Sequence, residues 1–153
     1  MVAASLRFLQ FFAKGFEPTE ELVEIVSRVE SKHPQVQFEQ ATLLTSLASE
    51  STQLPKQLLR RLLDSPSWIV TRTTYGLIGQ LHEEPLRKEL VQRYKETDDE
   101  RERLILLEAL GEWLEPEEAQ LFEEEMLATK NQKIRQVTLN VLIENLDCPG
   151  VKS

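Results

Sequence analysis

The sequence has few of the side chains on which catalysis and metal binding usually depend. Its 153 residues include one cysteine, Cys148, and two histidines, His33 and His82. A single thiol cannot form an intrachain disulfide, which favours a cytoplasmic location. The histidines stand in no His-Glu-x-x-His motif and the sequence has no Cys-x-x-Cys pair, so we expect no metal site.

Other catalytic motifs are missing as well. Cys148 has no base nearby in the sequence that would activate it as a nucleophile. Gly76 and Gly79 lack the lysine and the preceding strand of a phosphate-binding loop. The run of glutamates at 123–125 is typical of a solvated helix face rather than of catalytic carboxylates, which need burial to raise their pKa. We therefore expect a protein that is not an enzyme and needs no cofactor.

Long hydrophobic runs are absent, and none approaches the roughly 18 apolar residues that cross a bilayer. The N-terminal stretch MVAASLRFLQFFAKGF is apolar, but Arg7 and Gln10 interrupt it and no basic leader precedes it. We interpret residues 2–14 as a capping helix rather than a signal peptide. A dimer interface and a remnant of a longer chain are the alternatives. Membrane attachment is disfavoured, because only Arg7 and Lys14 are basic.

Positive charge is scarce in the second half of the chain. The formal net charge is −8; residues 1–80 hold 8 basic and 8 acidic side chains, and residues 81–153 hold 10 and 18. An acidic chain repels phosphate groups, which argues against nucleic acid and anionic membranes as partners. It suits a protein or peptide partner with a basic face.

Strand signals are lacking too, since there is no Asn-Gly or Asp-Gly hairpin and no sustained period-two alternation. What the sequence has instead is a repeat. Four segments share an apolar pattern when counted from Val36, Val70, Glu102 and Ile134, origins that are 34, 32 and 32 residues apart. Offsets 0, +4, +8 and +11 fall on one narrow arc of a helix, which predicts a buried stripe. At offsets +4, +5, +8, +9 and +11 the segments carry Gln40, Ala41, Leu44, Thr45 and Leu47; Thr74, Tyr75, Ile78, Gly79 and Leu81; Leu106, Leu107, Leu110, Gly111 and Trp113; and Thr138, Leu139, Leu142 and Ile143, with Leu146 one place late.

Shorter amphipathic segments precede these four, and each carries a proline near its start, where a helix tolerates the missing N–H. These prolines are Pro18, Pro55, Pro85 and Pro116, and the candidate N-caps are Thr19, Ser65 and Asp98 or Asp99. The sequence thus predicts one all-α domain over residues 1–153. It consists of the capping helix at 2–14 and four antiparallel helix pairs at approximately 18–50, 54–82, 84–114 and 115–147.

Two glycines gain a role from this pattern. Gly79 and Gly111 occupy the same offset, +9, beside the buried stripe. A missing side chain there would allow close approach of a neighbouring helix. Gly76 has no counterpart at its offset, and the sequence offers no reason for it.

The segments VTRTTYGLIGQL, ERERLILLEALGEW and IRQVTLNVLIENL resemble the second helix of HEAT-like repeats, in the armadillo-like group. Arg103 and Arg135 stand at the arginine offset of that pattern, +1, whereas Gln37 and Thr71 depart from it. The resemblance implies an α-solenoid of about four helix pairs. A tetratricopeptide array also fits the period but lacks its tryptophan, leucine-glycine and tyrosine spacing. A non-repeating helical bundle is the other alternative.

The resemblance also implies that the second helices line a concave surface through offsets +2, +3, +6 and +10. These positions hold Phe38, Glu39, Thr42 and Ser46; Arg72, Thr73, Gly76 and Gln80; Leu104, Ile105, Glu108 and Glu112; and Gln136, Val137, Asn140 and Glu144. Four of them are apolar where water is expected, which is typical of an interaction site unless these side chains pack against neighbouring second helices. The predicted partner-binding residues are Phe38, Arg72, Thr73, Leu104, Ile105, Glu108, Glu112, Val137, Asn140 and Glu144.

We therefore expect a non-catalytic protein–protein interaction module, such as an adaptor, scaffold or regulatory domain. It would bind a basic amphipathic helix or an extended peptide. One alternative is an accessory subunit of an enzyme complex, as in HEAT-like bilin lyases. Another is a nucleic-acid binder using Arg60, Arg61 and Arg72, which the acidity disfavours.

Overall fold

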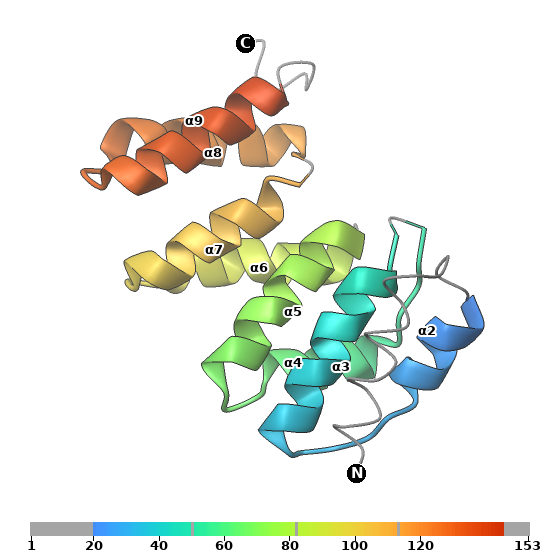
Figure 1. Ribbon diagram of the computed structural model, residues 1–153. Helices are drawn as coiled ribbons and strands as arrows, with labels where there is room; N and C mark the ends of the chain where they lie inside the picture. Colours follow the sequence, from blue (N-terminus) through green and yellow to red (C-terminus); the bar gives the residue numbers. More distant parts are fainter. Residues whose placement is uncertain (1–19, 50, 82, 113, 146–153) are drawn as a thin grey trace. The chain divides into compact units, whose positions relative to one another are not determined.

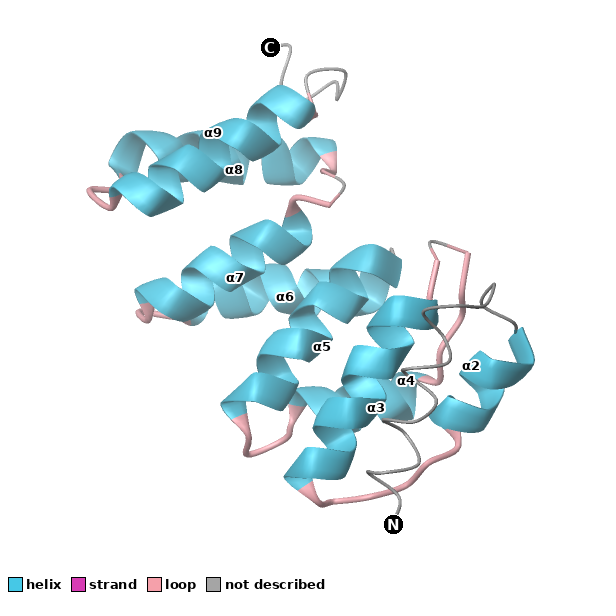
Figure 2. Ribbon diagram, in the orientation of Figure 1, coloured by secondary structure: helices cyan, strands magenta, loops and turns pink. Residues whose placement is uncertain are grey.

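The computed structural model describes residues 20–49, 51–81, 83–112 and 114–145. Within these ranges the chain forms eight α-helices and no strand, which confirms the predicted all-α class (Figures 1 and 2). The helices are α2 (Glu20–Ser27), α3 (Pro34–Leu47), α4 (Lys56–Leu63), α5 (Trp68–Leu81), α6 (Glu84–Glu96), α7 (Glu100–Leu110), α8 (Pro116–Ala128) and α9 (Gln132–Glu144). The predicted capping helix at 2–14, together with Thr19, Trp113 and Leu146, lies outside the described residues.

The chain divides into two compact units, Met1–Leu81 and His82–Ser153. The first unit contains the helix pairs α2–α3 and α4–α5, and the second contains α6–α7 and α8–α9. In every pair a short connector turns the chain back, so that the second helix packs against the first.

In the first unit the second helices, α3 and α5, lie side by side and run in the same direction (Figure 1). Near their N-terminal ends, the Ser65 hydroxyl donates to Gln37 Oε1 over 2.7 Å. At their C-terminal ends, Gln80 Nε2 donates to the Ala48 carbonyl, 32 residues away. Arg61 of α4 donates to the Val29 carbonyl over 2.9 Å, also 32 residues away. Contacts between the two pairs thus recur at the spacing of the sequence repeat.

The second unit repeats this arrangement. Asn131 Nδ2 donates to Glu100 Oε2 over 2.9 Å at the N-terminal ends of α9 and α7. Gly111, just after α7, contacts Val141 near the end of α9, so these helices also run in the same direction. Between the first helices, Tyr94 of α6 contacts a residue of α8 that is 31 positions later, Glu125. Equivalent positions of consecutive pairs therefore lie next to each other.

The predicted stripe is buried at offsets +4 and +8 in all four second helices. At offset 0 it is buried in three of them, and Glu102 is half-exposed. Beside the stripe, at offsets +5 and +9 of the last pair, Leu139 and Ile143 are exposed. In the preceding pair, α9 covers Gly111 at offset +9. Among the described residues of this unit, no further second helix follows α9 to cover Leu139 and Ile143 in the same way.

The role predicted for Gly111 is confirmed. A Cβ atom at this position would lie 2.4 Å from Val141 Cγ2 and 3.0 Å from the Leu107 carbonyl oxygen. The glycine therefore lets α9 approach the end of α7 more closely than any larger residue would allow. Gly76 is different, since a Cβ atom there would meet nothing within 4 Å. Close packing does not explain that glycine.

Each connector between the helices of a pair contains the same pair of hydrogen bonds. At offset −5 a hydroxyl residue accepts a bond from the backbone N–H two residues later, and its own carbonyl accepts one from the side chain at offset +1. The hydroxyl contacts are Ser31 with His33 N, Ser65 with Ser67 N, Thr97 with Asp99 N and Thr129 with Asn131 N, at 3.1, 3.3, 3.2 and 3.2 Å. The side-chain donors are Gln37, Thr71, Arg103 and Arg135, at 3.2, 3.3, 3.0 and 2.6 Å from that carbonyl. Offset +1 thus holds a donor in every pair, which explains why an amide and a hydroxyl replace arginine in the first two.

The helix starts match the sequence signals with one correction. Asp99 is the N-cap of α7 and accepts a bond from Arg101 N over 2.8 Å. Pro116 occupies the first turn of α8. Ser65 is not the N-cap of α5, because that helix begins at Trp68. Its hydroxyl serves the connector instead.

An arginine is almost fully buried in the core of the second unit. Arg87 of α6 is 1% exposed, and its Nε donates to Glu118 Oε1 of α8 over 2.9 Å. Its Nη2 donates to the other carboxylate oxygen and to the Leu110 carbonyl at the end of α7. Glu118 in turn accepts a bond from Glu115 N, which closes the capping box of α8. This one ion pair ties the end of α7 to the beginning of α8.

Candidate functional site

The second-helix surface of the first unit is largely engaged with its own backbone. The hydroxyls of Thr42, Ser46 and Thr73 each donate to the carbonyl four residues earlier. Phe38 is half-buried, as is Gly76. Glu39 does not face water as predicted, because it is buried and accepts a 2.8 Å bond from Gln35.

Arg72 is the charged residue that this first surface exposes. It lies on α5 one turn after Trp68 and close to Ile69, both of which are exposed large hydrophobic side chains. The Trp68 ring meets the buried Tyr75 ring edge-on, with centroids 6.4 Å apart. The N-terminal end of α5 therefore has an exposed surface that is apolar and positively charged. None of the predicted surface positions of the first unit adds an exposed carboxylate to it.

The second-helix surface of the second unit differs in both charge and exposure. Glu108 of α7 is exposed, and so are Glu112, two residues after the end of α7, and Glu144 of α9. Beside them, three apolar side chains of the predicted set are half-buried; these are Leu104, Ile105 and Val137. Because α7 and α9 run side by side in the same direction, equal offsets lie next to each other. The apolar residues thus sit toward the N-terminal ends of both helices, and the carboxylates sit toward the C-terminal ends.

The charged side chains among the predicted residues of this second surface are all negative. Within the described residues, none of the three carboxylates forms an ion pair. Gln136 and Asn140, which complete the surface, are exposed and bond to each other over 2.8 Å. Arg103, the nearest basic residue of α7, donates instead to the Thr97 carbonyl. We call the eight residues from 104, 105, 108 and 112 and from 136, 137, 140 and 144 the acidic surface.

A cluster on the opposite side of α7 involves Tyr94, Arg103 and Glu125. The Tyr94 hydroxyl donates to Glu125, and the Arg103 guanidinium lies 5.7 Å from the centre of the tyrosine ring. Burial, together with the bond to the Glu125 carboxylate, raises the pKa of Tyr94 well above its usual value. The phenol therefore stays protonated and acts as a structural donor.

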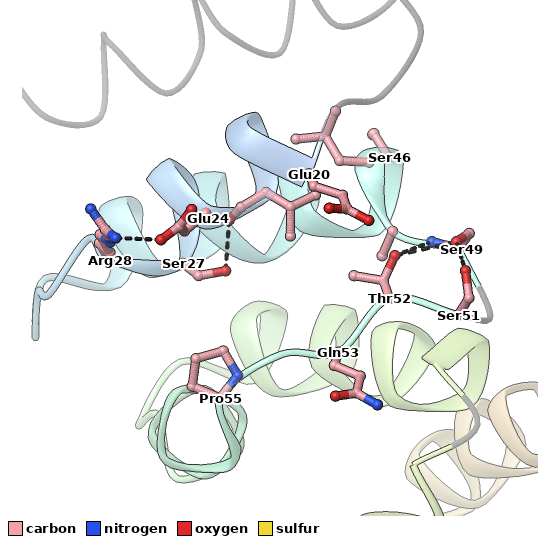
Figure 3. Close-up of a pocket in the computed structure, with 13 residues that line it drawn as sticks. Glu20, Glu24, Ser27, Arg28, Ser46, Ser49, Ser51, Thr52, Gln53 and Pro55 are labelled. Carbon is pink, nitrogen blue, oxygen red and sulfur yellow. Dashed lines mark hydrogen bonds and ion pairs between the residues drawn. The ribbon is translucent and has the colours of Figure 1, made fainter.

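An open pocket of about 970 Å³ lies in the first unit, between α2, the end of α3 and the loop before α4 (Figure 3). Its polar side chains largely bond to each other or to nearby backbone. The Ser49 hydroxyl lies 3.0 Å from that of Ser51, Thr52 accepts from Ser49 N, and Ser27 donates to the Val23 carbonyl. The lining therefore does not point to a particular ligand.

The part of the chain that the structure describes holds neither a metal-binding cluster nor a helix that could span a membrane. It contains no group of three or more histidine, cysteine, aspartate or glutamate side chains placed to hold a metal ion. His33 is the N-cap of α3, and its Nδ1 accepts a bond from Gln35 N over 3.3 Å. Within the same ranges, every helix falls short of the length and apolar character that crossing a bilayer requires.

Comparisons with protein-family models, with curated proteins and with solved structures found no match for this chain. The site must therefore be judged on its own geometry. Sequence reasoning placed the acidic surface through its offsets. It missed Arg87 and the connector hydroxyls, although Ser31, Ser65, Thr97 and Thr129 recur at one offset and could have been found.

Proposed function

We propose that this protein is a non-catalytic protein–protein interaction module that binds a basic amphipathic segment through the acidic surface. In this proposal the helix pairs form a HEAT-like α-solenoid, and the protein works in the cytoplasm. The recurring contacts 31 and 32 residues apart within each unit support the repeat. Because fold alone does not establish function, the proposal rests on the surface itself.

The observation that carries it is the composition of the acidic surface. Within the described residues, three carboxylates without an ion pair stand next to three half-exposed apolar side chains, on two adjacent parallel helices and just after the end of α7. Unpaired surface carboxylates of one sign raise the local concentration of basic ligands and speed their association. The apolar residues supply the buried contact area that gives affinity. A helix or extended segment with lysine or arginine on one side and leucine on the other complements both features.

A designed peptide tests this directly. The probe is a fluorescein-labelled amphipathic peptide with leucine on one face and lysine on the other, titrated with the full chain and followed by anisotropy. Reversing two charges with Glu108→Lys and Glu112→Lys should weaken binding by about tenfold or more, because each reversal replaces attraction by repulsion. Val137→Ser should weaken it further through loss of apolar contact.

The matched control carries Glu117→Lys and Glu124→Lys on the exposed face of α8, which changes the net charge by the same amount. It should leave the affinity within about twofold of the unchanged protein. Equal loss in both double variants would mean that the peptide senses only overall charge, and the proposed site would be wrong. A peptide in which glutamate replaces lysine should not bind.

A further inference from the structure

We propose that the chain self-associates through the outer edge of its last helix pair, a surface separate from the acidic surface. The outer edge consists of Glu123 and Leu127 on α8 and of Arg135, Leu139 and Ile143 on α9. The occupant that we infer is a second copy of the same edge. In the pair, α8 of one copy lies against α9 of the other.

The edge concentrates exposed apolar surface. Leu127 is 80% exposed, Ile143 is 52% exposed and Leu139 is 39% exposed. These are three of the six large hydrophobic side chains that are exposed among the described residues. Single exposed hydrophobic residues are ordinary, but a group on one side of one helix pair marks an interaction surface.

The three side chains point away from the rest of the unit. On α9, Val141 packs against Gly111, and Leu139 and Ile143 each lie about 160° around the helix from Val141 at 100° per residue. On α8, Glu118 contacts α6, and Leu127 lies about 180° from it. The three apolar side chains therefore lie on one outer face of the helix pair, on the side that faces away from α6 and α7.

The preceding helix pair shows that a face of this kind packs against another helix. Leu139 and Ile143 occupy offsets +5 and +9 of the repeat, and the corresponding residues of α7 are Leu107 and Gly111. Both are fully buried, and the second helix of the next pair covers Gly111 directly. The α9 residues of the outer edge occupy the same offsets as this buried face of α7 and are also apolar, so the outer edge is suited to packing against another helix.

The charges of the edge favour a second copy over a foreign partner. The α8 side carries Glu123, and the α9 side carries Arg135, so the edge as defined holds one charge of each sign. A two-fold axis parallel to the helices places α8 of each copy against α9 of the other. Glu123 of each copy then faces Arg135 of the other, and the contact forms twice. A partner of one charge sign would be repelled by one half of the edge.

Sedimentation velocity of the full chain, from micromolar to near-millimolar concentration, tests the proposal. A reductant must be present, because Cys148 would otherwise allow a disulfide-linked dimer. We expect a reversible dimer whose population falls at least tenfold in the Leu139→Ser and Ile143→Ser double variant. Ile25→Ser, which changes an equally exposed isoleucine of the first unit, should leave the dimer unchanged.

Charge reversal provides a sharper test of the geometry. Glu123→Arg should abolish the homodimer, because it places like charges opposite each other twice. Arg135→Glu should do the same, and it also removes the connector bond to the Thr129 carbonyl. Mixing the two single variants should restore association, since opposite charges then meet at both contacts. Circular dichroism confirms that each variant is folded. The proposal would be overturned if the chain is a monomer at all concentrations or if these substitutions do not change the dimer population. It would also be overturned if the mixture of the two single variants stays monomeric.

Discussion

Two glycines of this protein should respond to the same substitution with opposite signs. Gly76→Ala adds a methyl group in the middle of α5, where a Cβ atom would meet nothing within 4 Å. The alanine therefore neither clashes nor gains packing, and only the backbone preference changes. Replacing glycine by alanine in a helix interior stabilises by about 1 kcal/mol. The expected rise in melting temperature is about 2 to 4 °C for a chain of this size.

Gly111→Ala adds the same methyl group at the end of α7 but meets a different environment. The new Cβ would lie 2.4 Å from Val141 Cγ2 and 3.1 Å from its Cγ1, and 3.0 Å from the Leu107 carbonyl oxygen. Valine is stiff at χ1, and the carbonyl belongs to the helix backbone, so neither can move cheaply. Overpacking of this kind costs about 1 to 3 kcal/mol.

The assay is urea unfolding followed by circular dichroism at the helix band. The Val141→Ala variant is measured alone and together with Gly111→Ala, to show whether the two side chains clash. Val141→Ala alone should destabilise by about 2 kcal/mol through lost burial. Combined with Gly111→Ala it removes both clashing methyl groups, so the double variant should be more stable than the sum of the single effects by about 1 to 3 kcal/mol. Strictly additive effects, or a Gly111→Ala protein as stable as the Gly76→Ala protein, would refute the close-approach reasoning.

Three further perturbations follow from the described contacts. Arg87→Met should destabilise the protein by about 3 to 5 kcal/mol in urea unfolding, because it leaves the Glu118 carboxylate without its buried partner; the further change Glu118→Leu should recover much of that loss. Asn131→Ala removes the N-cap of α9 and should cost about 1 kcal/mol, whereas Asn131→Ser should retain most of the stability because its hydroxyl can accept the same bonds. The raised pKa of Tyr94 means that the folded state holds the phenolic proton more tightly than the unfolded state. Its contribution to stability is complete below about pH 10 and falls by up to about 1.4 kcal/mol per pH unit above it; Tyr94→Phe should remove that part of the pH dependence measured by urea unfolding between neutral and strongly alkaline pH.

The helices and their buried stripes could be predicted because burial imposes a period on the sequence. Val70, Thr74 and Ile78 are buried in α5 although one of them is polar, since their spacing rather than their type places them on the inner face. The same reasoning makes no prediction for Leu139 and Ile143, which lie beside the stripe at offsets +5 and +9. Leu107 and Gly111 are buried at these offsets in the preceding pair, but exposure there depends on whether another helix lies beside them. That neighbour is not encoded in the segment itself.

The interactions between pairs were harder to predict than the pairs. Arg87 in a charged segment looks like a solvated side chain, and only the stacking of α6 and α8 brings it to Glu118. The hydrogen bonds of the connector could not be recognised from residue types alone. Gln37 and Arg103 occupy the same offset but have only an N–H donor in common. The acidic surface could be located from offsets, whereas the burial of Glu39 could not, because a neighbouring glutamine satisfies it.

The connectors also bear on how quickly the chain can fold. Each of their hydrogen bonds joins residues at most six positions apart, so a connector needs no distant part of the chain to close its bonds. Closing such small loops costs little entropy, and topologies dominated by sequence-local pairing fold fastest. A turn that forms early would bring its two helices together before any neighbouring pair arrives. Weakening a connector should therefore slow refolding more than it speeds unfolding.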